Sequence, residues 1–270
     1  MILDVVARDG LVLLGCGKMG TALLTGWLQA GLPATSVWVL EPSPTDWLVA
    51  TGVRLNVALP KSPAVALVAV KPQMMGAALP ALQALGNGTT LFISIAAGTS
   101  IAAFEAALGS QTPIVRTMPN TPAMVGRGIT GICGNAHAGP AGLALAHSLM
   151  QAVGQVVELD GEHQIDAVTA VSGSGPAYVF YLIEVMAAAG VAEGLPPDIA
   201  MHLARATVCG AGELAYRAAE PAAQLRINVT SPGGTTAAAL AHLMDPATGL
   251  PPLMARAVHA AAERGRELSK

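Results

Sequence analysis

The chain has 270 residues and a formal net charge of −3 at pH 7, and 53% of its residues are hydrophobic while only 11% are charged. This hydrophobic content excludes a disordered chain, and the slight acidity with scattered Lys and Arg excludes an electrostatic nucleic-acid surface. Because average proteins carry roughly 25% charged residues, we expect part of this surface to be covered by another chain. The composition favours one or two globular domains, self-association and a small substrate.

The mean hydropathy of +0.54 raises the question of a membrane span, which needs about 20 apolar residues. The uncharged stretch 72–104 is interrupted by Pro80 and Gly86, and the apolar stretch 167–183 is broken by glycines and a proline. We therefore expect short buried elements and no transmembrane helix. The first ten residues lack the features of a signal peptide, so we expect a cytoplasmic protein.

The three cysteines, Cys16, Cys133 and Cys209, are widely spaced and have neither a CxxC pattern nor neighbouring histidines. This spacing favours small buried thiols over disulfides or metal ligands, and we expect no metal site.

The first half of the chain alternates short apolar runs with helical stretches. Strands are expected over residues 11–14, 37–40, 66–70, 91–95 and 114–116, and helices over 19–30, 74–85 and 100–108. Residues 66–70 are apolar at every position, as expected for a strand covered on both faces. The pattern predicts an α/β fold with a doubly wound parallel sheet and ligand sites at the carboxyl ends of the strands.

The strand pattern stops near residue 160. Helices are expected over residues 165–189, 198–218 and 251–268, separated by glycine and proline pairs. We therefore predict a Rossmann-like nucleotide-binding domain over residues 1–160 and an all-helical domain over residues 161–270. Helices this apolar are buried most readily against a second copy, so a helical dimer is expected.

A glycine-rich turn follows the first strand. Residues 15–20, Gly-Cys-Gly-Lys-Met-Gly, connect that strand to a helix, and this position favours a dinucleotide site over an ordinary tight turn. Glu41, at the end of the next strand, suits a ribose 2′-hydroxyl unless it is merely solvated, whereas Ser43 suits a 2′-phosphate. The choice between NADH and NADPH stays open on these residues.

Three further turns are expected at the same edge of the sheet. Lys71 follows the strand 66–70 and either contacts the cofactor or is solvated, and Pro72 makes the bend after it rigid. Residues 95–98 have small side chains that let a flat ring lie close, and residues 118–122 form a stiff turn able to line a pocket.

Two segments of the helical half contain glycine and proline, residues 172–176 and residues 231–236. The second, Ser-Pro-Gly-Gly-Thr-Thr, is typical of a helix N-terminus with free backbone N–H groups and two hydroxyls. Such a terminus is a preferred site for a carboxylate, although simple helix capping is the alternative. The six histidines lie outside both segments, so no strong general base is evident.

With these motifs, the chain resembles pyrroline-5-carboxylate reductases from residue 11 to residue 268. The resemblance is carried, in the family's order, by residues 15–20, 69–73, 94–98, 116–122, 166–178, 190–195 and 231–236. It implies a Rossmann-like domain followed by a dimerisation domain similar to the C-terminal domain of 6-phosphogluconate dehydrogenase. The implied activity is NAD(P)H-dependent reduction of the cyclic imine 1-pyrroline-5-carboxylate to L-proline, the last step of proline biosynthesis, in dimers that sometimes form decamers.

The resemblance also implies the site residues. Cofactor contacts are implied at Leu14, Gly15, Cys16, Gly17, Lys18, Met19, Ser43, Asn56, Ala69, Val70, Lys71 and Pro72, and substrate contacts at Ser231, Gly233, Gly234, Thr235 and Thr236. Backbone N–H groups and the Thr236 hydroxyl would hold the substrate's carboxylate and ring nitrogen, with Thr236 as the candidate proton donor. A protonated imine is already electrophilic, so positioning beside the nicotinamide suffices.

The chain departs from the family pattern at several positions. Lys18 stands where asparagine or glutamine is usual, Ala64 replaces an aspartate, and Ala206 replaces a glutamine. The expected cofactor is NADP, with NADPH, the family's usual cofactor, as donor, while Glu41 places a negative charge beside Ser43 that shifts the preference towards NADH and leaves NADH open as an alternative.

Two other functions compete with the reductase. A β-hydroxyacid dehydrogenase or imine reductase shares this two-domain layout, but alcohol oxidation calls for a lysine on the first long helix of the second domain, and residues 172–193 contain none. A protein that senses NAD(P) without turnover would not need an anion-binding segment at residues 231–236. The sequence leaves open the size of the assembly and whether a related cyclic imine is the substrate.

Overall fold

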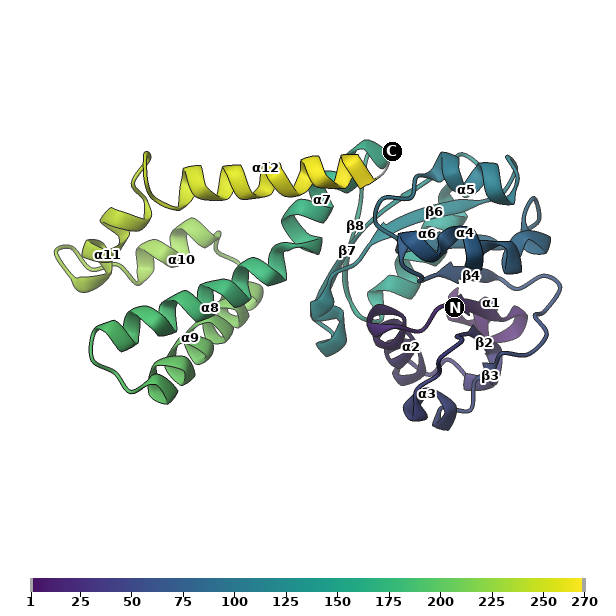
Figure 1. Ribbon diagram of the computed structural model, residues 1–270, viewed down its shortest axis with the longest axis horizontal. Helices are drawn as coiled ribbons and strands as arrows, with labels where there is room; N and C mark the ends of the chain where they lie inside the picture. The colour runs from purple at the N-terminus through teal and green to yellow at the C-terminus, as the bar shows by residue number, and fades with distance from the viewer. Residues whose placement is uncertain (1, 269–270) are drawn as a thin grey trace. The chain divides into compact units, whose positions relative to one another are not determined.

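The computed structural model describes residues 2–268 (Figure 1). The chain divides into two compact units, a first unit made of the residues up to Gly173 together with those from Ala261 onward, and a second unit, Ser174–Ala260. Residues 161–173 therefore pack with the first unit. The predicted boundary between the nucleotide-binding and helical domains near residue 160 stays a prediction.

One eight-stranded sheet with the order β3-β2-β1-β4-β5-β6-β7-β8 organises the first unit. Its strands are β1 (Leu11–Leu14), β2 (Val37–Leu40), β3 (Arg54–Leu55), β4 (Val65–Val68), β5 (Leu91–Ser94), β6 (Ile114–Met118), β7 (Gly128–Gly134) and β8 (Gly154–Glu158). Strands β1 to β6 are parallel, β7 is antiparallel to β6, and β8 is parallel to β7. The parallel part has the Rossmann order, and the strand order reverses between β1 and β4.

Helices cover both faces of this sheet, as predicted. They are α1 (Ile2–Asp9), α2 (Lys18–Gln29), α3 (Asp46–Ala50), α4 (Met75–Ala78), α5 (Ile101–Leu108), α6 (Gly139–Gln151) and α7 (Ile165–Val168). Alternate residues of β1 face opposite cores, since Leu13 packs in one cluster with Trp27 of α2 and Leu14 packs in another with Phe104 of α5. The Trp27 indole N–H donates to the Leu149 carbonyl of α6 at 2.8 Å. The doubly wound fold is confirmed.

The helix expected over residues 74–85 is only partly α-helical. Pro72–Met74 and Leu79–Leu85 are 3₁₀ segments on either side of the one-turn helix α4. Pro80 has no N–H to donate within a helix, which accounts for the early end of α4.

The second unit is all-helical, as predicted. Its helices are α8 (Gly175–Ala192), α9 (Pro197–Arg217), α10 (Ala222–Asn228), α11 (Thr235–Leu243) and the first part of α12 (Leu250–Leu268). Helices α8 and α9 form a pair around buried Ala187, Ala200 and Ala204. Gly190 lies at this contact, where a Cβ would be in ordinary van der Waals contact with the Ala200 Cβ at 3.4 Å.

The expected break at residues 172–176 is present but short, because Ser174 is a bend and α8 begins at Gly175. A π turn over Thr169–Gly173 joins α7 to α8, and Pro176 stands in the first turn of α8, where its missing N–H costs nothing. The resulting segment Glu162–Ala192 is, by length and composition alone, long and apolar enough to cross a membrane. The π turn and the bend at Ser174 interrupt the regular α-helix, but they do not divide the segment into two separate short elements as expected.

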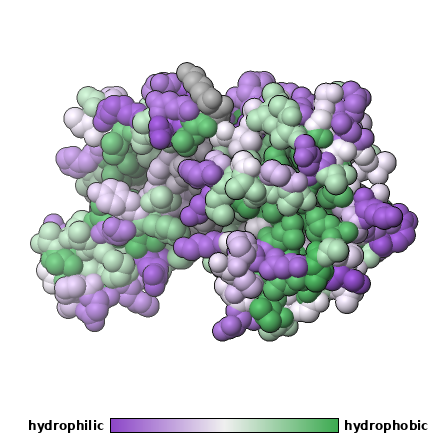
Figure 2. Space-filling model, turned by 45° about the vertical axis from the view of Figure 1, so that its right-hand side comes forward, coloured by the Kyte–Doolittle hydropathy of each residue, from purple (hydrophilic) through white to green (hydrophobic). Residues whose placement is uncertain are grey.

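Large apolar side chains are exposed along α8, among them Phe180 and Tyr181. Broad hydrophobic areas also lie open on the face of the molecule shown in Figure 2. Exposed apolar surface of this kind marks an interaction site.

Candidate functional site

The glycine turn after β1 has the geometry expected of a dinucleotide site. Gly15 has φ +86°, and a Cβ on it would lie 2.8 Å from a Val70 methyl group. A Cβ on Gly20 would lie 2.7 Å from the Gly15 carbonyl oxygen, so this glycine lets α2 approach the turn. A Cβ on Gly17 would meet nothing within 4 Å. The turn thus leaves open space over its backbone at Gly17 and the start of α2, where a pyrophosphate binds in this motif.

The strand ends bring most of the expected cofactor residues to one edge of the sheet. The Gly15 N–H donates to Leu40 of β2 at 2.8 Å, and the Ala69 N–H donates to Leu14 of β1 at 2.8 Å. Of the expected residues at this edge, those that are exposed are Gly17, Lys18, Ser43, Asn56 and Lys71, and those that are buried or half-buried are Leu14, Gly15, Cys16, Met19, Ala69, Val70 and Pro72.

Glu41 is tied to the glycine turn, a contact that sequence reasoning missed. One carboxylate oxygen accepts the Cys16 N–H at 2.8 Å, and the other accepts the Ser43 N–H at 3.0 Å. Parallel β1 and β2 place the two segments side by side, but no signal in the sequence distinguishes this arrangement from a solvated carboxylate.

Asn56 follows β3 at the same edge and braces the backbone of Glu41. Its side-chain oxygen accepts the Glu41 N–H at 2.9 Å, and its amide nitrogen donates to the Glu41 carbonyl at 2.8 Å. Asn56 adopts φ +51°, a left-handed conformation that asparagine tolerates better than most residues. This amide therefore positions the loop after β2.

The buried cysteines are poor nucleophiles. Burial raises the pKa of the Cys16 thiol, an effect opposed by the Thr21 hydroxyl and reinforced by the charge of Glu41. Burial raises the pKa of Cys133 to about 11, so both thiols stay protonated at neutral pH. Cys209 is exposed, so the expectation that all three are buried is wrong. Among residues 2–268, no group of three or more His, Cys, Asp and Glu side chains could hold a metal ion.

A partly buried ion pair joins β6 to the segment before α7. Arg116 is only 3% exposed, and its Nη1 donates to a Glu162 carboxylate oxygen at 2.8 Å. The same oxygen accepts the Ile101 N–H, at the start of α5, at 2.7 Å. The sequence placed Arg116 in a family motif but did not predict its partner.

The turn at residues 118–122 contributes a second polar link. The Asn120 amide nitrogen donates to the Ser172 hydroxyl at 3.2 Å, and its oxygen accepts the Ile129 N–H at 2.9 Å. Asn120 thereby connects this turn to β7 and to the π turn.

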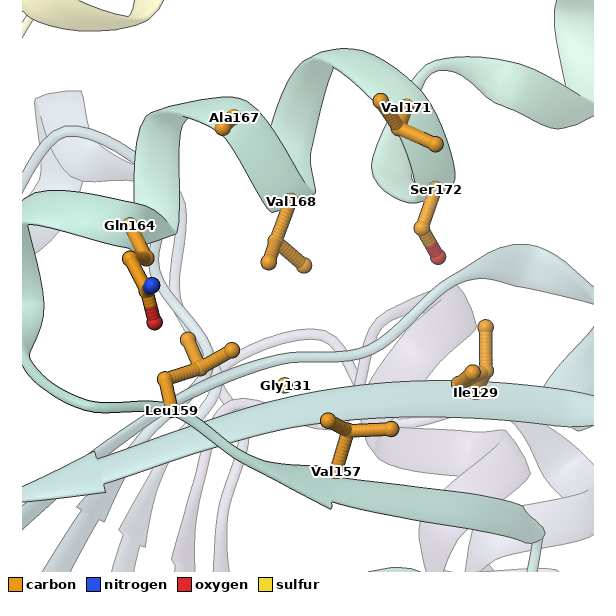
Figure 3. A pocket seen from close by; sticks show the side chains of 9 residues that line it. All are labelled: Ile129, Gly131, Val157, Leu159, Gln164, Ala167, Val168, Val171 and Ser172. Carbon is orange, nitrogen blue, oxygen red and sulfur yellow. The ribbon is translucent and has the colours of Figure 1, made fainter.

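An apolar hollow of about 390 Å³ lies between the β7–β8 pair and the segment that contains α7 and the π turn (Figure 3). Its lining residues are Ile129, Gly131, Val157, Leu159, Gln164, Ala167, Val168, Val171 and Ser172. None of them is charged, and the two polar ones are already hydrogen-bonded, Gln164 to the Asp160 N–H and Ser172 to Asn120. The hollow therefore has no charged or readily ionised side chain in its lining.

The expected substrate segment lies in the second unit and forms a helix N-terminus. Gly234 precedes the first residue of α11, Gly233 has φ +70°, and no side chain caps the helix. The Gly234 N–H donates to the Ser231 carbonyl at 3.0 Å, so the first free N–H groups are those of the opening turn of α11. Ser231, Gly233 and Thr235 are exposed, and Thr236 is half-buried. This arrangement can bind a small carboxylate.

Comparisons with known proteins match both halves of the chain. A family model for pyrroline-5-carboxylate reductase dimerisation matches residues 162–268, and one for coenzyme F420-dependent NADP oxidoreductases matches residues 11–98. The pyrroline-5-carboxylate reductase of Pseudomonas aeruginosa is 39% identical over 95% of this chain and 96% of its own length. That of Methanosarcina acetivorans is 37% identical over 95% and 97%.

Solved structures agree. A pyrroline-5-carboxylate reductase from Coxiella burnetii superposes with a TM-score of 0.88 at 33% identity and covers 97% of this chain and 99% of its own. The pyrroline carboxylate reductase of Plasmodium falciparum, solved with NADP bound, has a TM-score of 0.81 at 30% identity with the same coverage.

Proposed function

Because the chain belongs to the pyrroline-5-carboxylate reductase family, we infer that it reduces 1-pyrroline-5-carboxylate to L-proline in proline biosynthesis. It is an NAD(P)H-dependent oxidoreductase acting on the CH–NH bond, and it binds NADP. Its dimerisation domain makes it self-associate.

The geometric observation that carries this function is the open backbone at Gly17, between two glycines whose Cβ positions are blocked. A dinucleotide fits this turn because its pyrophosphate can approach bare N–H groups at the start of α2. When bound, it supplies a hydride for the imine carbon. We propose that residues 14–19 and 69–72 hold it, with Ser43 near the adenosine ribose and Asn56 keeping the loop after β2 in place.

We propose that residues 231–236 bind the substrate. The uncapped N–H groups at the start of α11 donate to the substrate carboxylate, which also benefits from the positive end of the helix dipole. The Thr236 hydroxyl contacts the ring nitrogen of the neutral imine and donates the proton that this nitrogen needs when the imine carbon takes up hydride, and the hydroxyl regains its proton from solvent water. No strongly basic side chain is required, because the chemistry consists of positioning and one proton transfer.

We also propose an assembly state and a cellular location. The hydrophobic face of α8 suits a dimer, with a decamer as the larger alternative, and light scattering at several protein concentrations distinguishes them. A cytoplasmic location fits an enzyme that uses a nicotinamide dinucleotide as its reductant, and fractionation of expressing cells tests it.

The activity is tested by following the nicotinamide absorbance of NADPH and NADH with purified protein, with and without racemic pyrroline-5-carboxylate. Oxidation that depends on the substrate supports the reductase. A folded protein that binds dinucleotide but oxidises it no faster with substrate contradicts this function and favours a sensor.

Thr236→Ala tests the proton donor. We expect kcat/KM for the imine to fall about 100-fold while the Kd for NADPH stays within about twofold, because general acids typically contribute at least that factor. Thr236→Ser keeps the hydroxyl and is the matched control, with most of the activity retained. If Thr236→Ala retains kcat/KM within about threefold of the original protein, the proton comes from elsewhere.

A further inference from the structure

The adenosine end of the glycine turn is marked by a fixed negative charge. Glu41 follows β2, and both of its carboxylate oxygens accept backbone N–H groups, from Cys16 at 2.8 Å and from Ser43 at 3.0 Å. Asn56 holds the backbone of Glu41 from both sides. The carboxylate is thus placed against the turn rather than left in solvent, and each oxygen keeps a lone pair for a further donor.

The segment after β2 supplies no cation to this end of the site. Residues 41–50 contain two carboxylates, Glu41 and Asp46, and neither lysine nor arginine. Arg54 on β3 is engaged elsewhere, because its Nε donates to the Thr35 carbonyl at 2.8 Å and its guanidinium lies 4.7 Å from the centre of the Trp38 ring. Both contacts draw it toward the start of β2, away from the carboxyl edge.

The exposed lysines Lys18 and Lys71 follow β1 and β4, not β2. Lys18 is the first residue of α2 and belongs to the turn, not to the loop after β2, and Lys71 follows β4, which β1 separates from β2. A 2′-phosphate, with a charge near −2, would therefore meet the Glu41 carboxylate and the neutral Ser43 hydroxyl, with no cation supplied by residues 41–50 or by Arg54. A ribose 2′-hydroxyl would instead donate to the carboxylate, as in NAD-binding Rossmann domains.

We propose that Glu41 sets the cofactor choice of this enzyme, by accepting the 2′-hydroxyl of the adenosine ribose and disfavouring a 2′-phosphate, so that NADH serves at least as well as NADPH. The proposal rests on the reductase function above and deepens it. Glu41 acts at a distance from the reacting atoms, so its effect appears in dinucleotide affinity and in KM rather than in kcat.

The test is a fluorescence titration of the full-length protein with NADH and with NADPH in the absence of imine, for the original sequence, Glu41→Gln and Asp46→Asn. We expect the original protein to bind NADH at least as tightly as NADPH. Glu41→Gln should tighten NADPH about tenfold and weaken NADH a few-fold, since glutamine keeps one acceptor oxygen and loses the charge. Asp46→Asn removes the same charge from the exposed start of α3 and should change either Kd by less than about twofold.

The outcomes are distinguishable. If Glu41→Gln changes the ratio of the NADH and NADPH Kd values by less than about threefold, the role of Glu41 is overturned. The same holds if Asp46→Asn changes this ratio as much as Glu41→Gln does. An original protein that binds NADPH more than tenfold tighter than NADH also overturns it. If a folded protein binds neither dinucleotide, the reductase function fails together with this inference. Circular dichroism of the three proteins establishes that each is folded.

Discussion

Removing the Glu162 carboxylate should destabilise the fold substantially, because this carboxylate is the ion-pair partner of the buried Arg116. Its oxygen lies 2.8 Å from the Arg116 Nη1, and the Arg116 side chain is 4% exposed against 31% for the Glu162 side chain. At that distance and an effective dielectric constant of about 20, the Coulomb attraction is about 6 kcal/mol. Desolvation of both groups opposes it and solvent reaches Glu162, so we expect Glu162→Ala to cost about 3 kcal/mol by leaving a buried guanidinium unpaired.

The assay is urea unfolding followed by circular dichroism at one fixed protein concentration, because self-association contributes to stability. Glu267→Ala is the matched control. Glu267 pairs with Arg264 at 2.7 Å, but both side chains are more than half exposed, so its removal should cost less than about 1 kcal/mol. If Glu162→Ala shifts the unfolding free energy no more than Glu267→Ala does, the ion pair with Arg116 is not a significant stabilising contact.

Three further substitutions test separate features. Gly20→Ala places a Cβ 2.7 Å from the Gly15 carbonyl oxygen and so pushes α2 away from the turn. We expect dinucleotide binding to weaken at least tenfold, and an unchanged affinity in a titration would contradict the close packing. Phe180→Glu introduces a charge at a side chain that is 59% exposed on α8 and should reduce self-association measured by light scattering. Val49→Glu, at a position 61% exposed on α3, is the control and should leave self-association unchanged. Equal effects of the two substitutions would place the interface elsewhere. The folded pKa of Cys133, about 11, lies above its unfolded value, so its contribution to stability is present below about pH 9 and is lost as the pH rises toward 11. Cys133→Ala should flatten the unfolding free energy over that interval, and an unchanged pH profile would refute this origin.

Much of the first unit could be predicted because its signals are local. The strands β1 and β4 are apolar at every position, and only a parallel sheet covered on both faces makes such runs favourable. The glycine turn and the N-terminus of α11 are likewise defined by neighbouring residues whose backbone requirements can be read directly.

Other parts could not be predicted because their signals are weak or distant. The strand β7, Gly-Ile-Thr-Gly-Ile-Cys-Gly, carries three glycines that lower strand propensity, and its stability comes from pairing on both sides. The π turn is invisible in composition, since glycine and serine read as a break. The partners of Glu41 and Arg116 depend on sheet register and on residues 25 and 46 positions away, respectively.

The two hydrogen bonds between Asn56 and the backbone of Glu41 have a consequence for how binding free energy is divided. They order the loop after β2 in the folded protein before a nucleotide binds. The conformational entropy that this loop loses therefore reduces the free energy of unfolding and does not weaken nucleotide binding. In the proposed cofactor site, this end is therefore formed before a nucleotide binds. Affinity at this end therefore depends on complementarity of charge and shape rather than on the ease with which the loop can adapt.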